Sequence, residues 1–172
     1  MIAAANPCKC GYLYQAERAC NKAPHCGAHY FQRLSGPLLD RFDLCVHVEA
    51  TSFTSLQNHE LGETTGDIAA RVRAARRCQS LRFSAHDGIH SNADAHGKLL
   101  TQTCALATET ISWLHKALDH FQLSPRGYHR MLRVARTIAD LEGSDTIEKP
   151  HLSEALSFRP FPASGETAKQ AG

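Results

Sequence analysis

The feature that most constrains the fold is the segment from Ser124 to Gly143, because it carries the local signals of one long helix. Ser124 is a good N-cap, and Pro125 occupies the first helical position, where its missing N–H is not needed. Gly143 supplies the stop, since glycine readily adopts the left-handed conformation that ends helices. Apolar residues recur at helical spacing on one face: Tyr128, Met131, Leu132, Ala135, Ile138 and Ala139. The segment therefore predicts a helix over 125–142 that packs against a core.

Weaker patterns predict further helices on both sides of that segment. Thr64, followed by Asp67, resembles a capping pair. An apolar stripe follows it: Ile68, Val72, Ala75 and Cys78. A third stripe consists of Ile111, Leu114, Leu118 and Phe121. A last helix begins at Pro150, residues 27–35 predict a short one, and residues 84–94 read as a loop.

Two short segments predict strands instead. Residues 1–5 (MIAAA) form an apolar run that ends where Asn6 and a proline follow. Residues 43–49 (DLCVHVE) alternate apolar and polar side chains, which is the period of a half-buried strand; the apolar face holds Leu44, Val46 and Val48. The expected fold is therefore mostly α with a short β portion.

The composition is that of a soluble folded domain. The chain has 172 residues, 42% of them hydrophobic, and no apolar run approaches the ~18 residues that span a bilayer. The N-terminus lacks the features of a secretory signal, so we expect a cytoplasmic protein with no membrane partner. The net charge is only +2, but five arginines fall between Gly66 and Phe83 and four between Ser124 and Thr137. These stretches either face the phosphates of a nucleotide or nucleic acid, or form solvated helix faces.

Seven cysteines are many for a chain of this length, and four of them fall within the first 26 residues. In a cytosolic protein, close spacing favours a metal over disulfides. The pattern C-x-C-x9-C-x5-C offers Cys8, Cys10, Cys20 and Cys26 as four candidate thiolate ligands for Zn²⁺. A metal-free loop is the competing interpretation. The three remaining cysteines are scattered and read as small apolar residues.

Four segments together resemble one family. They are AAANPCKCGYL at 3–13, RLSGPLLDRFDL at 33–44, LSPRGYHRMLRVARTIADLEGSD at 123–145 and PHLSEALSFR at 150–159. In order and spacing they are similar to the C-terminal portion of magnesium-chelatase-like AAA+ ATPases of the ComM/YifB competence-protein type. That resemblance implies a hexameric ring that binds ATP and Mg²⁺ between subunits, and the ComM-type members are linked to DNA branch migration during natural transformation. Family members often have a C-x-C pair where this chain has Cys20 and Lys22, so His25 or Cys26 would have to replace the missing ligand.

The resemblance also implies roles for individual residues. Asn6 matches sensor 1, which helps to position the water that attacks the γ-phosphate. Arg41 matches the arginine finger that reaches the ATP of a neighbouring subunit, and its place before the strand at 43–49 predicts an exposed side chain. Arg126 matches sensor 2, which contacts the ATP of its own subunit from the first turn of its helix. Arg130 and Arg133 share its face and would extend the positive surface or remain solvated.

By the same resemblance the chain divides into four parts. Residues 1–56 are expected to be the C-terminal part of the AAA+ α/β nucleotide core, 57–105 a connecting and helical region, 106–160 the helical lid, and 161–172 a disordered tail. No G-x-x-x-x-G-K-[ST] motif and no Walker B strand occur in the sequence. We therefore expect a fragment of the ATPase that is inactive alone. The alternatives are a small zinc-stabilised module that binds nucleic acid, or a partner that modulates a complete ring.

Overall fold

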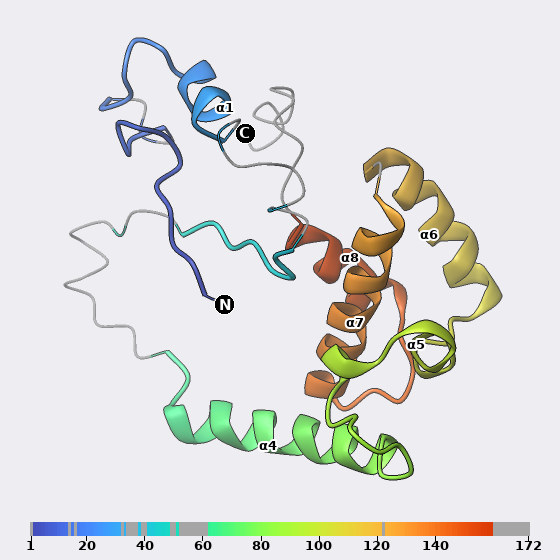
Figure 1. Ribbon diagram of the computed structural model, residues 1–172. Helices are drawn as coiled ribbons and strands as arrows, with labels where there is room; N and C mark the ends of the chain where they lie inside the picture. The colour runs from blue at the N-terminus through green and yellow to red at the C-terminus, as the bar shows by residue number, and fades with distance from the viewer. Residues whose placement is uncertain are drawn as a thin grey trace. The chain divides into compact units, whose positions relative to one another are not determined.

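A computed structural model shows a chain of two compact units. It describes residues 2–13, 15, 17–31, 33, 38, 41–48, 51, 62–121 and 123–159. The first unit contains the described residues up to Phe42, and the second runs from Asp43 to Arg159. The tail predicted at 161–172 lies outside the described residues, as do residues 52–61. Figure 1 labels the helices of both units.

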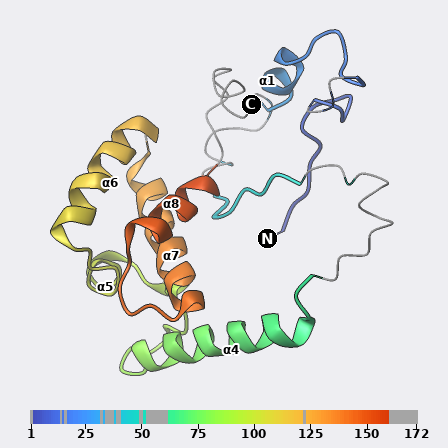
Figure 2. The same cartoon turned by 180° about the vertical axis from the view of Figure 1, so that it is seen from behind.

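The second unit is a helical bundle organised around one central helix. Its elements are α4 (Thr65–Arg82), the 3₁₀ turn η1 (Asn92–Asp94), α5 (Gly97–Thr103), α6 (Thr108–Phe121), α7 (Pro125–Glu142) and α8 (Lys149–Ser157). Helix α7 contacts α4, η1, α5 and α8, while α6 contacts α8 (Figures 1 and 2). No helix among the described residues is long and apolar enough to cross a membrane.

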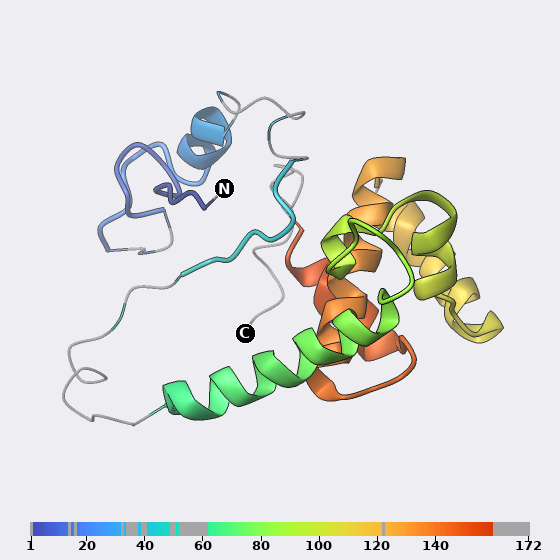
Figure 3. The ribbon, with the colours of Figure 1, turned by 60° about the horizontal axis from the view of Figure 1, so that its bottom comes forward.

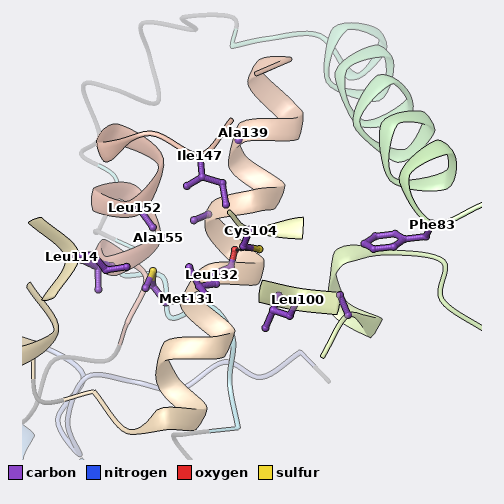
Figure 4. Packing of buried hydrophobic residues seen from close by; sticks show 13 residues of the cluster. Phe83, Leu100, Cys104, Leu114, Met131, Leu132, Ala139, Ile147, Leu152 and Ala155 are labelled. Carbon is purple, nitrogen blue, oxygen red and sulfur yellow. Dashed lines mark hydrogen bonds between the residues drawn. The ribbon is translucent and has the colours of Figure 1, made fainter. Parts of the chain in front are cut away.

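Helix α7 has the bounds and both caps that its sequence predicts. The Ser124 hydroxyl accepts a hydrogen bond from the Gly127 N–H at 3.0 Å. Gly143 has φ 81°, in the left-handed region, and its N–H donates to the carbonyls that end the helix. The predicted apolar face is largely buried and belongs to one core that the rest of the second unit shares. Figure 4 labels residues of this core: Phe83, Leu100, Cys104, Leu114, Met131, Leu132, Ala139, Ile147, Leu152 and Ala155.

Helix α4 has its predicted N-cap, but the face that it buries is not the predicted one. The Asp67 N–H donates to the Thr64 hydroxyl at 3.2 Å. However, the side chains of Ile68 and Val72 are 43% and 45% exposed. The second half of α4 lies beside α7, and the first half extends beyond the other helices (Figure 3). The buried residues of α4 are Ala75 and Gln79, so the predicted stripe is wrong except at Ala75.

A charged network joins α4 to α7 inside the bundle. Arg82 donates two hydrogen bonds to the Asp140 carboxylate, at 2.8 and 2.5 Å. The buried Arg136 also binds that carboxylate, at 3.0 Å, and Asn92 donates its side-chain amide to it at 2.8 Å. A buried carboxylate with three such donors is well compensated. Burial raises the pKa of Asp140, but the hydrogen bonds from Arg82 and Asn92 and the charge of Arg136 outweigh it and lower the pKa.

The two predicted strands do not form among the described residues. Residues 2–6 and 44–48 have no strand assignment. A strand needs a neighbouring strand for its hydrogen bonds, and the described residues contain none for either segment. The alternation at 43–49 is therefore exposed rather than buried, and Val46 and Val48 are 68% and 83% accessible. The segment instead meets α8 through its backbone, because the Cys45 N–H donates to the Phe158 carbonyl at 2.7 Å.

In the part that the structure describes, the first unit consists mainly of turns and the short helix α1 (His25–Phe31). This helix begins two residues before the predicted 27–35. Gly11 closes a turn with φ 81°, and its N–H donates to the Cys8 carbonyl at 3.1 Å. Gly27 is buried, and a Cβ there would lie 2.6 Å from the Leu13 side chain and 3.4 Å from the Pro7 carbonyl. Glycine thus lets the first turn of α1 approach the loop at 7–13 closely.

Candidate functional site

Arg41 and Asn6, the residues expected to act in catalysis, both lie exposed in the first unit. The Arg41 N–H donates to the Leu38 carbonyl at 3.0 Å, which fixes its backbone in a turn. Its exposure agrees with the expectation for a side chain that must reach a neighbour. Of the two acids beside it, Asp43 forms an ion pair with Arg130 at 3.7 Å, and Asp40 lies outside the described residues.

Arg126 lies exposed in the first turn of α7, in the second unit. The N-terminus of a long helix favours an anion through its dipole and its free N–H groups. Of those groups, the Gly127 N–H is already bonded to Ser124. The arginines that share its face differ: Arg130 is bound to Asp43, and Arg133 donates its Nε–H to the Ala95 carbonyl at 2.8 Å. Among these three arginines, Arg126 alone is exposed.

A residue that sequence reasoning missed lies beneath the same turn. Arg159 is buried, and its guanidinium would be 3.3 Å from a Cβ placed on Gly127. Its charge also acts to lower the pKa of Cys45, although burial raises that pKa overall. A positive side chain therefore lies directly behind the start of α7. Arg159 ends the quoted segment at 150–159, but nothing local in the sequence indicates a buried cation there.

The cysteines of the first unit converge. The Sγ atoms of Cys8, Cys10 and Cys26 all lie within 4.8 Å of one another. Cys8 is fully buried, and its Sγ is 3.0 Å from that of Cys10. The side chain of Cys20 interacts with those of both Cys10 and Cys26. The structure thus brings Cys8, Cys10 and Cys26 together, and Cys20 is a neighbour of two of them.

The cluster places its thiols in contrasting environments. The neighbouring Cys8 thiol, with backbone N–H groups of Tyr12 and Cys20, lowers the pKa of Cys10 to about 6. Burial, together with the thiols of Cys20 and Cys8, raises the pKa of Cys26 to about 12.

A basic hollow of about 490 Å³ adjoins the cluster. Cys26 is one of its lining residues, and the others carry or can carry positive charge or a hydroxyl: Lys9, Lys22, His29, Tyr30 and Arg33. The hollow therefore joins the cysteines to a positive surface within the same unit.

Two family profiles match this chain, each in a different part of the sequence. The profile described as "Magnesium chelatase, subunit ChlI C-terminal" matches residues 62–159, and the one described as "Magnesium chelatase, subunit ChlI" matches residues 1–56. The chain belongs to the magnesium-chelatase ChlI family. The C-terminal profile covers the bundle from α4 to Arg159, so the helical unit is the family's C-terminal domain.

Curated relatives place the chain among ComM- and YifB-like members of this family. It is 39% identical over 160 residues to the competence protein ComM of Haemophilus influenzae. It is 38% identical over 160 residues to the uncharacterized YifB proteins of Salmonella typhimurium and Escherichia coli. Each match covers 92% of this chain but 30% of the relative. The chain therefore spans about a third of the length of these chelatase-like relatives.

Proposed function

We propose that this chain supplies nucleotide-sensing residues to a ring-forming AAA+ ATPase of the ComM type. The observation that supports this best is the state of Arg126, which is exposed on the first turn of a helix whose other arginines are engaged. An exposed guanidinium at a helix N-terminus suits contact with a nucleotide phosphate. In this proposal residues 106–160 form the lid, and residues 1–56 belong to the α/β nucleotide core.

Each proposed residue has a separate task. Arg126 acts as sensor 2 and binds the phosphates of ATP held by its own subunit. Arg41 acts as the finger in the adjacent subunit's site, where its fixed charge stabilises the negative charge that develops on the transferred phosphoryl group. Asn6 acts as sensor 1, because its side-chain amide can donate and accept at once and so orient the attacking water. ATP and Mg²⁺ would be held by the phosphate-binding and Walker B motifs of the complete ATPase.

Nucleic acid is the proposed substrate of the assembled ring. The ComM relative is named a competence protein, and DNA branch migration is the activity proposed for such a ring here. Exposed arginines on α4, such as Arg73 and Arg77, support a phosphate-contacting role for that helix. The α7 arginines support it less, because Arg130, Arg133 and Arg136 are bound to groups of their own unit.

The test is a hybrid enzyme in which this chain replaces the matching segment of a complete ComM-type relative. We expect the hybrid to hydrolyse ATP and the chain alone to show no turnover. Arg41→Ala should reduce turnover by about 10³-fold or more, as for other arginine fingers. Arg126→Ala should raise the KM for ATP by roughly ten- to a hundredfold, the loss of a charged hydrogen bond. Lys116→Ala, which removes an exposed cation of α6 that has no role in this proposal, is the matched control and should leave both unchanged.

Mixing experiments separate a finger from a merely structural arginine. Arg41→Ala hybrids mixed with Walker-inactive hybrids that retain Arg41 should recover turnover, because a finger acts across the subunit boundary. If the mixed rings assemble and remain inactive, Arg41 is not the finger. If Arg126→Ala leaves the KM for ATP unchanged, the sensor 2 assignment is wrong.

A further inference from the structure

We propose that Cys8, Cys10, Cys20 and Cys26 together bind one zinc ion as four thiolate ligands. The proposal rests on the convergence of these cysteines within the first unit. Three of the sulfur atoms lie within 4.8 Å of one another, and the fourth cysteine contacts two of them. All four are free thiols: Cys8 and Cys10 belong to one turn, Cys20 precedes another, and Cys26 lies at the start of α1.

The sulfur distances suit a tetrahedral ion. Zn–S bonds of about 2.3 Å place tetrahedral sulfur ligands roughly 3.8 Å apart. In the observed triad, Cys8 and Cys10 are 3.0 Å apart and the other two pairs lie within 4.8 Å, so their separations are close to that value. A small shift of these three sulfur atoms would therefore bring them to the spacing of zinc ligands. Rotation about the cysteine side-chain bonds provides such a shift.

The backbone around the cysteines is arranged to hold their positions. Gly11, in its left-handed conformation, closes the turn that begins at Cys8 and places Cys10 on the same side. The Ala23 N–H donates to the Cys20 carbonyl at 2.9 Å, and the Cys26 N–H to the Lys22 carbonyl at 2.9 Å. Close contact of Gly27 with Pro7 and Leu13 then brings α1 against the first loop. Local hydrogen bonds and this close approach thus hold the backbone that carries the converging thiols.

The charges around the cluster favour four thiolates. A zinc ion with four thiolates carries a net charge of −2, which is stabilised by nearby cations. Lys9, Lys22 and Arg33 line the hollow that includes Cys26, and His29 lies there too. The remaining cysteines are poorly suited to the same chemistry. Cys104 is buried in the helical core, where burial raises its pKa to about 11, and Cys78 is exposed on α4.

Metal analysis of the full chain tests the site directly. Protein prepared under reducing conditions should contain one zinc per chain, and titration of its thiols should release that zinc. Replacement by Co²⁺ should produce the intense sulfur-to-metal charge-transfer absorption of tetrahedral thiolate coordination. Zinc-free protein with freely reactive thiols at these positions, a disulfide among them, or a bound iron–sulfur chromophore would each overturn the proposal.

Variants identify the ligands without relying on activity. Cys26→Ser and Cys20→Ser should each lower zinc content to background, whereas Cys78→Ser is the matched control and should retain one zinc. Because histidine is also a zinc ligand, Cys20→His should recover zinc and shift the Co²⁺ spectrum. If a serine variant misfolds, this rescue still decides the question. Full zinc content in Cys20→Ser would remove Cys20 from the site.

Discussion

The two units of this chain differ in what holds them together. The helical unit has a continuous apolar core to which α5, α6, α7 and α8 all contribute. In the described part of the first unit, Cys8 is the one buried hydrophobic side chain. Burial of apolar surface contributes roughly 25 cal/mol per Å², so the first unit gains little stability from this source. Small units without a core usually depend on a metal, a disulfide or a partner.

This difference also separates the residues that we propose for nucleotide sensing and hydrolysis. Arg126 is positioned by a helix that the core fixes, so its geometry depends on packing. Arg41 and Asn6 lie in a unit whose turns are held by local hydrogen bonds and, in our proposal, by zinc. Changes to the core should therefore affect Arg126 first, and changes to the cysteines should affect Arg41 and Asn6 first.

The largest expected effect is on the first unit after metal removal. If zinc binds the four cysteines, a chelator should abolish amide protection across residues 2–31, because the ion is the main source of stability there. Protection across α7 and α8 should be unchanged. Hydrogen exchange by mass spectrometry measures both at once. If both units lose amide protection equally, or if neither loses it, the first unit does not depend on a metal more than the helical unit does.

Removal of the buried carboxylate of α7 should produce the largest effect on the helical unit. Asp140→Ala should lower its free energy of unfolding by about 3–5 kcal/mol, because the buried Arg136 would lose its partner and Arg82 its link to α7. Urea unfolding followed by circular dichroism measures the change. Asp145→Ala is the control, since Asp145 is exposed, and should change stability by less than about 0.5 kcal/mol. Similar losses in both variants would contradict the network.

Alanine substitutions of core and of exposed apolar residues in the helical unit should differ almost as strongly in their cost to the free energy of unfolding. Leu132→Ala should cost about 2–5 kcal/mol, because its side chain is buried between helices. Val48→Ala should cost close to nothing, because that side chain is 83% exposed. Thermal or urea unfolding compares them. A large cost at Val48 would mean that the segment at 43–48 packs as a strand in solution.

The helical unit should also lose stability in acid. The folded state lowers the pKa of Asp140, so this group contributes stability above its ordinary value of 3.8. That contribution is lost as pH falls through the lower pKa of the folded state. Urea unfolding at pH 7, 4 and 2.5 should show the decrease mainly at the lowest pH. In Asp140→Asn, the free energy of unfolding should depend less on pH. If its pH dependence is unchanged, other carboxylates cause the loss of stability in acid.

The sequence predicts this molecule well where the signals are local. Helix α7 was predicted with its caps because Ser124, Pro125 and Gly143 each act within one turn. The face of α4 was predicted wrongly because its orientation depends on Arg82 and Asp140, which are 58 residues apart. The spacing of apolar residues within a helix does not predict an ion pair between residues so far apart in the sequence. Helix α5 was missed because seven residues give too short a pattern.

For the candidate sites too, the sequence predicts local features and not those that depend on distant residues. Spacing identified the four cysteines, but it could not place Cys26, because that depends on the close approach of Gly27 to the first loop. The strand prediction at 43–49 read the alternation correctly but could not supply a neighbouring strand. The different states of Arg126, Arg130 and Arg133 follow from Asp43 and Ala95, which are distant in sequence.

The smallest expected effect compares two helix caps of the same chemistry. Ser124 caps α7, which the core holds along its length, whereas Thr64 caps the half of α4 that extends from the bundle. Ser124→Ala should lower global stability by about 1 kcal/mol, because the capped turn carries the buried Gly127 and unfolds with the domain. Thr64→Ala should fray the first turns of α4 and leave the melting temperature unchanged, since Ile68 and Val72 are already exposed. Hydrogen exchange should show faster exchange confined to residues 65–72 in that variant. If Thr64→Ala instead lowers the melting temperature as much as Ser124→Ala does, the first half of α4 is packed against something in solution, and its exposed arginines are not free to contact nucleic acid.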